Sequence, residues 1–262
     1  MNIEELQSLE DWFYAYCDSF SMTEAEDQRN IALKQVHTQE VCLNAVRIAQ
    51  DLKMDPQSST LAEATALFHD VGRFPQYKQY KTFDDSISTN HAALGTRVLR
   101  ENKTLEKLAK HDQEIIVRSV ALHNVFSLPV NLDDETRLFA ELVRDADKLD
   151  ILRVFIEYFE QDEKSRAGAV ALGLSNTPEY SQDIMSCLKK GKMALKAMLR
   201  NQNDFKLLQL TWIYDLNFVS SFRMLVERNL IARLSEKLPG TDEVAQAVGL
   251  VRGYVDKKLQ GR

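Results

Sequence analysis

The chain has 262 residues, of which 44% are hydrophobic and 27% are charged, so it is long enough to bury a core without disulfides or structural metals. Its net charge of −6 does not favour a nucleic-acid partner bound through a large basic surface, although one local pocket could still bind a small phosphorylated ligand. Glycine (9) and proline (5) are scarce, which favours long helices over an all-β fold.

Helical periodicity extends over almost the whole chain. The first two helices are predicted over residues 3–17 and 26–52. Thr60 and Glu63 have the spacing of a capping box, which predicts that a third helix begins at Leu61.

The third helix is predicted to end near Asp70. Gly72 can adopt the left-handed conformation that often follows a helix, and Pro75 opposes continuation. Residues 71–88 then mix aromatic, basic and acidic side chains without a period. They are predicted to form a long loop, and loops of this length are often functional.

The rest of the chain is also expected to be helical. Six further helices are predicted over residues 89–101, 112–124, 134–160, 178–201, 204–235 and 241–259. Asp133 or Asp134 is expected to cap the helix over 134–160. The apolar stretch flanked by Gly168 and Gly173 is expected to be irregular.

Three features bear on the compartment. The N-terminal segment is acidic and lacks the basic and apolar regions of a signal peptide, and no run of about 18 apolar residues occurs. Cys17, Cys42 and Cys187 are odd in number and far apart, which does not indicate a disulfide framework or a zinc finger. We therefore expect a cytoplasmic protein without a membrane partner.

All five histidines lie between residues 37 and 123. Four are on the apolar stripes of four different predicted helices: His37, His69, His91 and His123. His111 is expected to be exposed. One buried histidine is ordinarily a hydrogen-bonded core residue, but four of them favour a metal site, because buried imidazoles need partners and helical proteins build dinuclear sites from inward-pointing ligands.

Such a site also needs carboxylates. Asp145, Asp147 and Asp150 lie in the strongly apolar helix predicted over 134–160. Asp145 aligns with one leucine-rich stripe and Asp147 with another apolar stripe, so the periodicity alone does not choose between them.

The ordered set of these residues resembles a known signature. His37, the pair His69-Asp70 and the later Ala146-Asp147-Lys148-Leu149 are similar to the H…HD…D motif of the HD-domain superfamily of metal-dependent phosphohydrolases. The stretch 67–73 is similar to the family's "LLHDIGK", and 90–95 resembles the "HxxxG" of members with two metals. The resemblance covers about residues 30–155.

The resemblance implies an all-α fold. Residues 1–160 would form an HD-type metal-binding helical bundle, and the resemblance also implies a ligand set for one metal: His37, His69, Asp70 and Asp147. The resemblance therefore selects Asp147 over Asp145. Residues 161–262 lie beyond the resemblance, and because no flexible linker precedes their predicted helices, we expect a helical extension packed on the bundle.

A second metal is implied at His91 and His123, with Asp70 bridging the two ions, and these three residues are the expected catalytic ones. Imidazole and carboxylate ligands suit Mn, Fe, Co, Ni or Zn better than Mg or Ca. We therefore expect divalent transition metals, two per chain at full loading.

Several charged or polar residues near the motif are candidates for contacting substrate. Arg73, Lys148 and Asn124 are the expected substrate-binding residues, whereas Lys78 and Lys81 fit a solvated loop better. Asp150 and Asp145 either orient ligands or form caps and ion pairs.

The expected function is hydrolysis of a small phosphomonoester or phosphodiester, nucleotide-like in character, by metal-activated water. The residues after His123, Asn124 to Pro129, lack the Gly-Tyr-Pro motif of cyclic-di-GMP phosphodiesterases, which argues against that substrate. Two alternatives stay open, a di-iron HD-type oxygenase and a non-catalytic nucleotide sensor.

Overall fold

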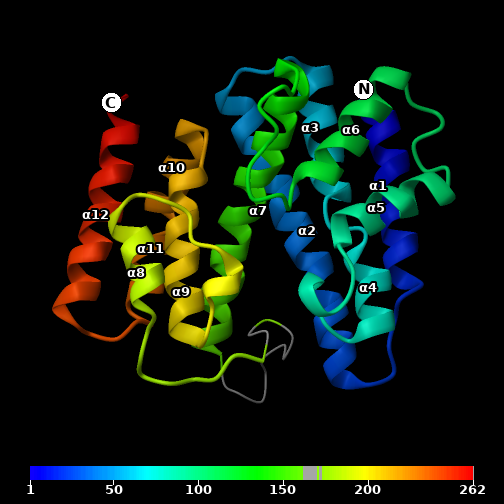
Figure 1. Cartoon of the computed structure of the whole chain (residues 1–262). Coiled ribbons are helices and arrows are strands. Elements are labelled where there is room, and N and C mark those ends of the chain that lie inside the picture. Colours follow the sequence, from blue (N-terminus) through cyan, green and yellow to red (C-terminus); the bar gives the residue numbers. More distant parts are fainter. Residues whose placement is uncertain (162–169, 171–172, 262) are drawn as a thin grey trace. The chain divides into compact units, whose positions relative to one another are not determined.

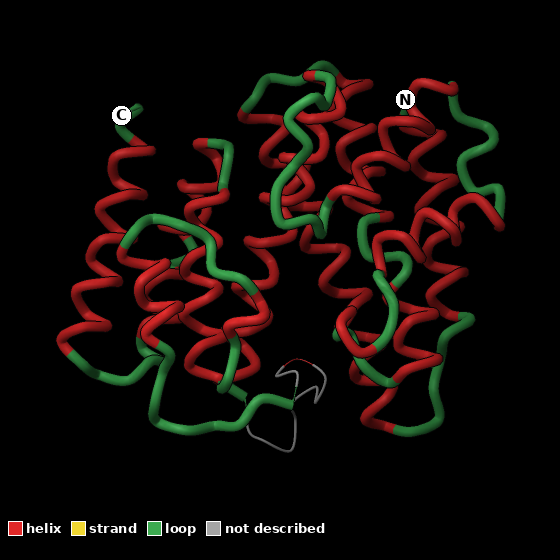
Figure 2. Tube along the Cα trace, viewed as in Figure 1, coloured by secondary structure: helices red, strands yellow, loops and turns green. Residues whose placement is uncertain are grey.

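The computed structural model describes residues 1–161, 170 and 173–261. These residues form helices joined by loops and turns (Figures 1 and 2), and their only β-type pairing is an isolated bridge between Ser175 and Asn201. The predicted all-α fold is therefore confirmed. None of the described helices combines the length and the apolar character that a membrane crossing requires.

The described residues fall into two compact units. One contains residues 1–150 and Val170, and the other contains residues 151–161 and 173–261. The helix α7 (Asp134–Glu160) contributes to both units. The domain limits expected from the sequence, and the packing of the second part on the first, stay predictions.

The first unit is built around one buried helix. Its elements are α1 (Ile3–Asp18), α2 (Ala25–Asp51), α3 (Pro56–Phe68), α4 (Arg73–Tyr80), η1 (Asp85–Ile87), α5 (His91–Glu101), α6 (Lys110–Leu122) and residues 134–150 of α7. The helix α3 packs against α1, α2 and α6. Its core residues are mostly small, including the fully buried Ala62, Ala64 and Ala66, so neighbouring helices can approach it closely. The C-terminal end of α3 therefore lies inside the unit.

The helix α3 begins five residues earlier than the sequence pattern predicts, so the predicted start at Leu61 is wrong. Asp55 is the N-cap and accepts a hydrogen bond from the backbone N–H of Ser58, at 3.0 Å. Pro56 takes the first helical position, where its missing N–H costs nothing. Thr60 lies inside the helix and donates its hydroxyl to the carbonyl oxygen of Pro56.

Residues 71–88 are not one long loop, contrary to the prediction. They contain the helix α4 and the short helix η1. Pro75 lies in the first turn of α4, where the backbone N–H groups have no partner within the helix, so proline is tolerated. The mixed composition concealed this helix, because polar Gln76 is buried beside Phe74 and Tyr77 and no single apolar stripe marks the buried face.

Gly72 has φ −72° and ψ −15°, so the predicted left-handed conformation is wrong. A glycine is needed here because there is no room for a side chain. A Cβ at this position would lie 2.2 Å from the carbonyl oxygen of His91 and 2.6 Å from the backbone nitrogen of Gly95. The start of α4 can therefore approach α5 closely, which brings His91 next to the end of α3.

The next three helices follow the predicted ranges closely. The helix α7 has the predicted bounds, and α5 and α6 differ from theirs by two residues at most. Asn90 caps α5 by accepting from the backbone N–H of Ala93, at 2.9 Å. Asp133 caps α7 by accepting from the N–H of Thr136, at 2.8 Å.

The second unit contains shorter helices than predicted. Its elements are residues 151–160 of α7, α8 (Gln182–Lys189), η4 (Lys196–Met198), α9 (Gln202–Thr211), η5 (Trp212–Asp215), α10 (Val219–Glu227), α11 (Leu230–Ser235) and α12 (Asp242–Leu259). The predicted helices over 178–201 and 204–235 are wrong as continuous elements. Asn201 starts α9 as a cap, and Asn229, with φ 52°, separates α10 from α11. Most of the stretch flanked by Gly168 and Gly173 lies outside the described residues.

Candidate metal centre

Four imidazoles and one carboxylate meet in the middle of the first unit. His37 comes from α2, His69 caps the end of α3 and is followed by Asp70, His91 begins α5, and His123 caps the end of α6. All five residues are buried, the most exposed being His123 at 5%. The structure thus brings together residues that are up to 86 positions apart in the sequence.

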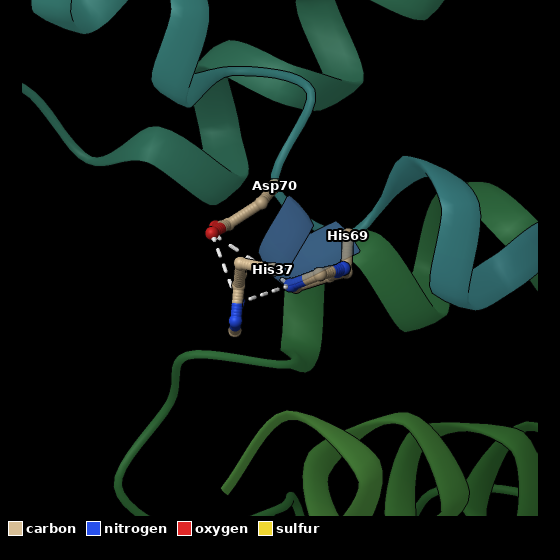
Figure 3. A group of neighbouring side chains, drawn as sticks. All are labelled: His37, His69 and Asp70. Carbon is tan, nitrogen blue, oxygen red and sulfur yellow. Dashed lines mark hydrogen bonds and ion pairs between the residues drawn. The ribbon is translucent and has the colours of Figure 1, made fainter. Parts of the chain in front are cut away.

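His37, His69 and Asp70 form the first of two groups that could hold a metal ion (Figure 3). The Nε2 atoms of His37 and His69 are 3.2 Å apart. They lie 3.5 and 3.7 Å from Oδ2 of Asp70. These atoms surround one point, as the ligands of one ion would.

Asp70, His91 and His123 form the second group. The Nε2 atoms of His91 and His123 are 2.9 Å apart and lie 3.3 and 3.8 Å from Oδ1 of Asp70. One oxygen of Asp70 therefore faces each histidine pair. A carboxylate placed in this way can bridge two ions.

The three aspartates of α7 have different positions. Oδ1 of Asp147 lies 3.1 Å from Nε2 of His37 and 3.7 Å from Nε2 of His69, so Asp147 faces the first group. Asp150 is fully buried and its Oδ2 lies 2.6 Å from Nδ1 of His37. Asp145 is also fully buried and is a member of neither group.

In each imidazole the Nε2 atom faces the other residues of the cluster, and the Nδ1 atom contacts a hydrogen-bond acceptor. Two acceptors are carbonyl oxygens one turn back in the chain, and two are carboxylates from other segments. The four pairs are His69 with the Ala66 oxygen at 2.6 Å, His123 with the Val120 oxygen at 2.8 Å, His37 with Asp150 at 2.6 Å and His91 with Asp85 at 2.7 Å. A carbonyl oxygen cannot donate, so Nδ1 of His69 and of His123 carries the proton.

Three of the rings are neutral. Burial lowers the pKa of His91 to about 3 and that of His123 to about 4, and burial also lowers the pKa of His69. With the proton on Nδ1, their Nε2 atoms present lone pairs to the centre. In the second group two such lone pairs face each other at 2.9 Å. Buried acceptors in this arrangement need a cation between them, so the residues fit a metal ion.

The pKa of His37 shifts in the opposite direction from those of the other three histidines of the cluster. Burial and the charge of Lys34 lower its pKa, but hydrogen bonds to Asp147 and Asp150 outweigh both and raise it to about 9. His37 therefore holds a proton that a metal must displace, and binding through its Nε2 releases that proton.

Two cations contact Asp70. Nζ of Lys34 is 2.7 Å from Oδ2, and Nε of Arg73 is 3.3 Å from Oδ1. Burial opposes the charge on Asp70, but the cations Lys34 and Arg73 beside it hold its pKa well below the usual range. Asp70 is therefore ionised at neutral pH.

Asp85 was not identified from the sequence. Its Oδ2 accepts from His91 and from Asn124, and its Oδ1 accepts from Arg73 and from Gln76. The short helix η1 that carries it has no periodic pattern, so no sequence signal pointed to this position. Lys34 was also missed, although it precedes His37 by three residues and so shares its helix face.

The expected substrate-binding residues lie close to these groups. Arg73 contacts Asp70 and donates from Nη1 to Gln76, to the Phe83 carbonyl and to Asp85. Asn124 donates to Asp85 at 3.2 Å, and Lys148 is half-buried beside Asp147 on α7.

Lys78 of α4, Lys81 directly after this helix and the remaining histidine lie elsewhere. Lys78 is exposed and its Nζ lies over the Phe20 ring, whereas Lys81 pairs with Asp27. His111 is exposed, as predicted, and pairs with Glu135 on the surface.

Comparison with known proteins supports the resemblance seen in the sequence. Residues 36–152 match the family described as HD domain. This range begins one residue before His37 and ends two residues after Asp150, so it contains both groups that could hold a metal ion. No curated protein and no solved structure matches the chain.

Proposed function

Because residues 36–152 of the chain form an HD domain, we propose that it is a metal-dependent phosphohydrolase that cleaves a small, nucleotide-like phosphomonoester or phosphodiester. The observation that carries this proposal is the position of Asp70 between two histidine pairs, with one oxygen toward each pair. Two ions sharing a carboxylate can bind both the attacking and the leaving oxygen of a phosphate ester.

The proposed ligands divide into two sets that share Asp70. His37, His69 and Asp147 complete the first set, and His91 and His123 complete the second. Their nitrogen and oxygen atoms suit Mn, Fe, Co, Ni or Zn. When bound, such ions polarise a phosphate oxygen and lower the pKa of a water molecule, so that hydroxide is available at neutral pH.

The chain's own residues contribute orientation and charge. The acceptors behind Nδ1 hold each imidazole so that its Nε2 faces the centre. Arg73 holds Asp70 and Asp85 in place by contacting both. The burial of these groups strengthens every charge interaction among them, because less water screens them.

The proposal also covers substrate contacts and compartment. Asn124 and Lys148 lie next to the proposed ligands His123 and Asp147, and Arg73 lies 3.3 Å from Asp70, so all three stay candidates for binding the substrate. A cytoplasmic location is part of the proposal, because Cys17, Cys42 and Cys187 are free thiols, as is usual in a reducing compartment.

The test is a screen on defined metal forms. The protein is stripped with a chelator, reloaded separately with Mn, Fe, Co, Ni or Zn, and assayed for phosphate release from a panel of phosphorylated nucleotides. We expect release with at least one metal and none after stripping. A His111→Ala variant serves as the control, because His111 is an exposed histidine outside the centre and its loss should leave activity unchanged.

Two outcomes would contradict the proposal. Oxygen consumption by the iron form without phosphate release with any metal would indicate an oxygenase. Tight nucleotide binding without turnover by any metal form would indicate a sensor.

A further inference from the structure

Lys34 places an ammonium group at the metal centre. It lies on α2 three residues before His37, so the two side chains are neighbours on one helix face. Its Nζ is 2.7 Å from Oδ2 of Asp70, the oxygen that faces His37 and His69. An ammonium group has no lone pair and cannot bind a metal, so Lys34 has a different role from its neighbours.

Lys34 retains hydrogen-bonding capacity. An ammonium group has three N–H donors, and in the part of the chain that the structure describes Lys34 has one acceptor, Oδ2 of Asp70. The ring of Phe83 faces Nζ at 5.2 Å and attracts the charge without accepting a conventional hydrogen bond. The Lys34 side chain is 14% exposed, against 4% for Asp70, so a ligand from solvent can reach it.

Arg73, the other cation at Asp70, is held by several protein acceptors. Its Nη1 donates to Gln76 at 2.8 Å, to the Phe83 carbonyl at 2.6 Å and to Asp85 at 2.9 Å. These bonds hold the guanidinium group in one orientation. Arg73 is thus positioned by several protein acceptors, whereas in the part of the chain that the structure describes Lys34 has one, Oδ2 of Asp70.

We propose that Lys34 is a substrate-binding residue that donates its remaining N–H bonds to a phosphate oxygen while Asp70 holds the ammonium group from the other side. This inference rests on the proposed function, since it requires a phosphorylated ligand at the centre. Lysine binds phosphate as a compact point charge, and charge-assisted hydrogen bonds are among the strongest in proteins.

The test measures binding of inorganic phosphate to the manganese-loaded protein by calorimetry, together with the metal content of the same samples. Lys34→Met should keep its metals and bind phosphate roughly 10- to 100-fold more weakly, which is the value of a hydrogen bond to a charged group. Lys107→Met is the matched control, because Lys107 is exposed and belongs to neither ligand group. It should bind phosphate like the unaltered protein.

Each result is decisive. Unaltered affinity in Lys34→Met would overturn the role of Lys34 and leave the proposed function standing. Loss of metal in Lys34→Met would also overturn it, because Lys34 would then support Asp70 rather than the substrate. Failure of the unaltered, metal-loaded protein to bind phosphate would overturn both proposals.

A second variant covers the case in which Lys34→Met does not fold. Lys34→Gln keeps an N–H donor for Asp70 but removes the charge. It should therefore fold, retain metal and show the same weakened phosphate binding, and phosphate binding equal to that of the unaltered protein would overturn the proposal.

Discussion

The candidate metal centre has two halves, the group of His37, His69 and Asp70 and the group of Asp70, His91 and His123. In the first half, His37 lies on α2 and is held by Asp150 of α7, two helices of 27 residues each. In the second half, His91 is the first residue of α5, and Asp85, which holds it, belongs to a helix of three residues. The two remaining imidazoles, His69 and His123, are both held by a carbonyl oxygen one turn back.

The comparison shows that the two halves depend on different parts of the fold. The first half is fixed by long packed helices. The second depends on a connecting segment that is held by side-chain hydrogen bonds from Arg73, Gln76 and Asn124 to Asp85. We therefore expect that the second half can be weakened without damage to the first.

The largest effect is expected for the residue that the two halves share. Asp70→Ala should cost both metals and lower turnover by more than about 1,000-fold, because several kcal/mol of transition-state stabilisation depend on the ions. Metal stoichiometry and phosphate release are measured on the same preparation. Retention of either metal would show that Asp70 does not bridge the two groups.

The next largest effect is expected for a substitution in the first half. Asp147→Ala should abolish tight binding of the first metal and with it the activity, because Oδ1 of Asp147 lies 3.1 Å from Nε2 of His37. Asp145→Ala is the matched control on the same helix and should keep its metal per folded molecule. If Asp145→Ala loses the metal and Asp147→Ala keeps it, the ligand lies on the other face of α7.

A substitution in the second half should lower metal content and turnover less. His123→Ala should remove mainly the second metal and lower turnover by about 100-fold or more, because His37, His69, Asp70 and Asp147 remain. Metal content and turnover are measured with His111→Ala as the control. Full activity in His123→Ala would reject the dinuclear mechanism in favour of a single ion.

The smallest effects are expected for the carboxylates that contact the Nδ1 atoms of the histidines. These variants distinguish the two halves best, because each should affect one metal only. Asp85→Asn should weaken only the second metal and Asp150→Asn only the first, each by about 10- to 100-fold, which is usual for such supporting carboxylates. Competition titrations with a coloured chelator give both affinities. If either variant lost affinity equally for both metals, the proposed difference between the halves would be wrong.

Much of the first half could be predicted from the sequence. His37 and Asp147 lie in long periodic segments, and the structure confirms that both segments are helices. The four buried histidines were also predicted, because each follows an apolar stripe. Asp145 and Asp147 could not be separated by periodicity, since both lie on apolar stripes of α7.

The support of the second half could not be predicted. Asp85 meets His91 and Asn124 through contacts that no helical or strand period encodes. Gly72 was read as a helix terminator, whereas it permits the backbones of α4 and α5 to approach each other. Close approach of this kind depends on tertiary packing, which a local pattern does not contain.

The central claim is that Asp70 joins two metal sites. The most direct measurement is anomalous diffraction from crystals of the manganese-loaded protein. We predict two peaks, each about 2 Å from one carboxylate oxygen of Asp70, one between Oδ2 and the pair His37 and His69, the other between Oδ1 and the pair His91 and His123. A single peak, or peaks bound without Asp70, would contradict the account.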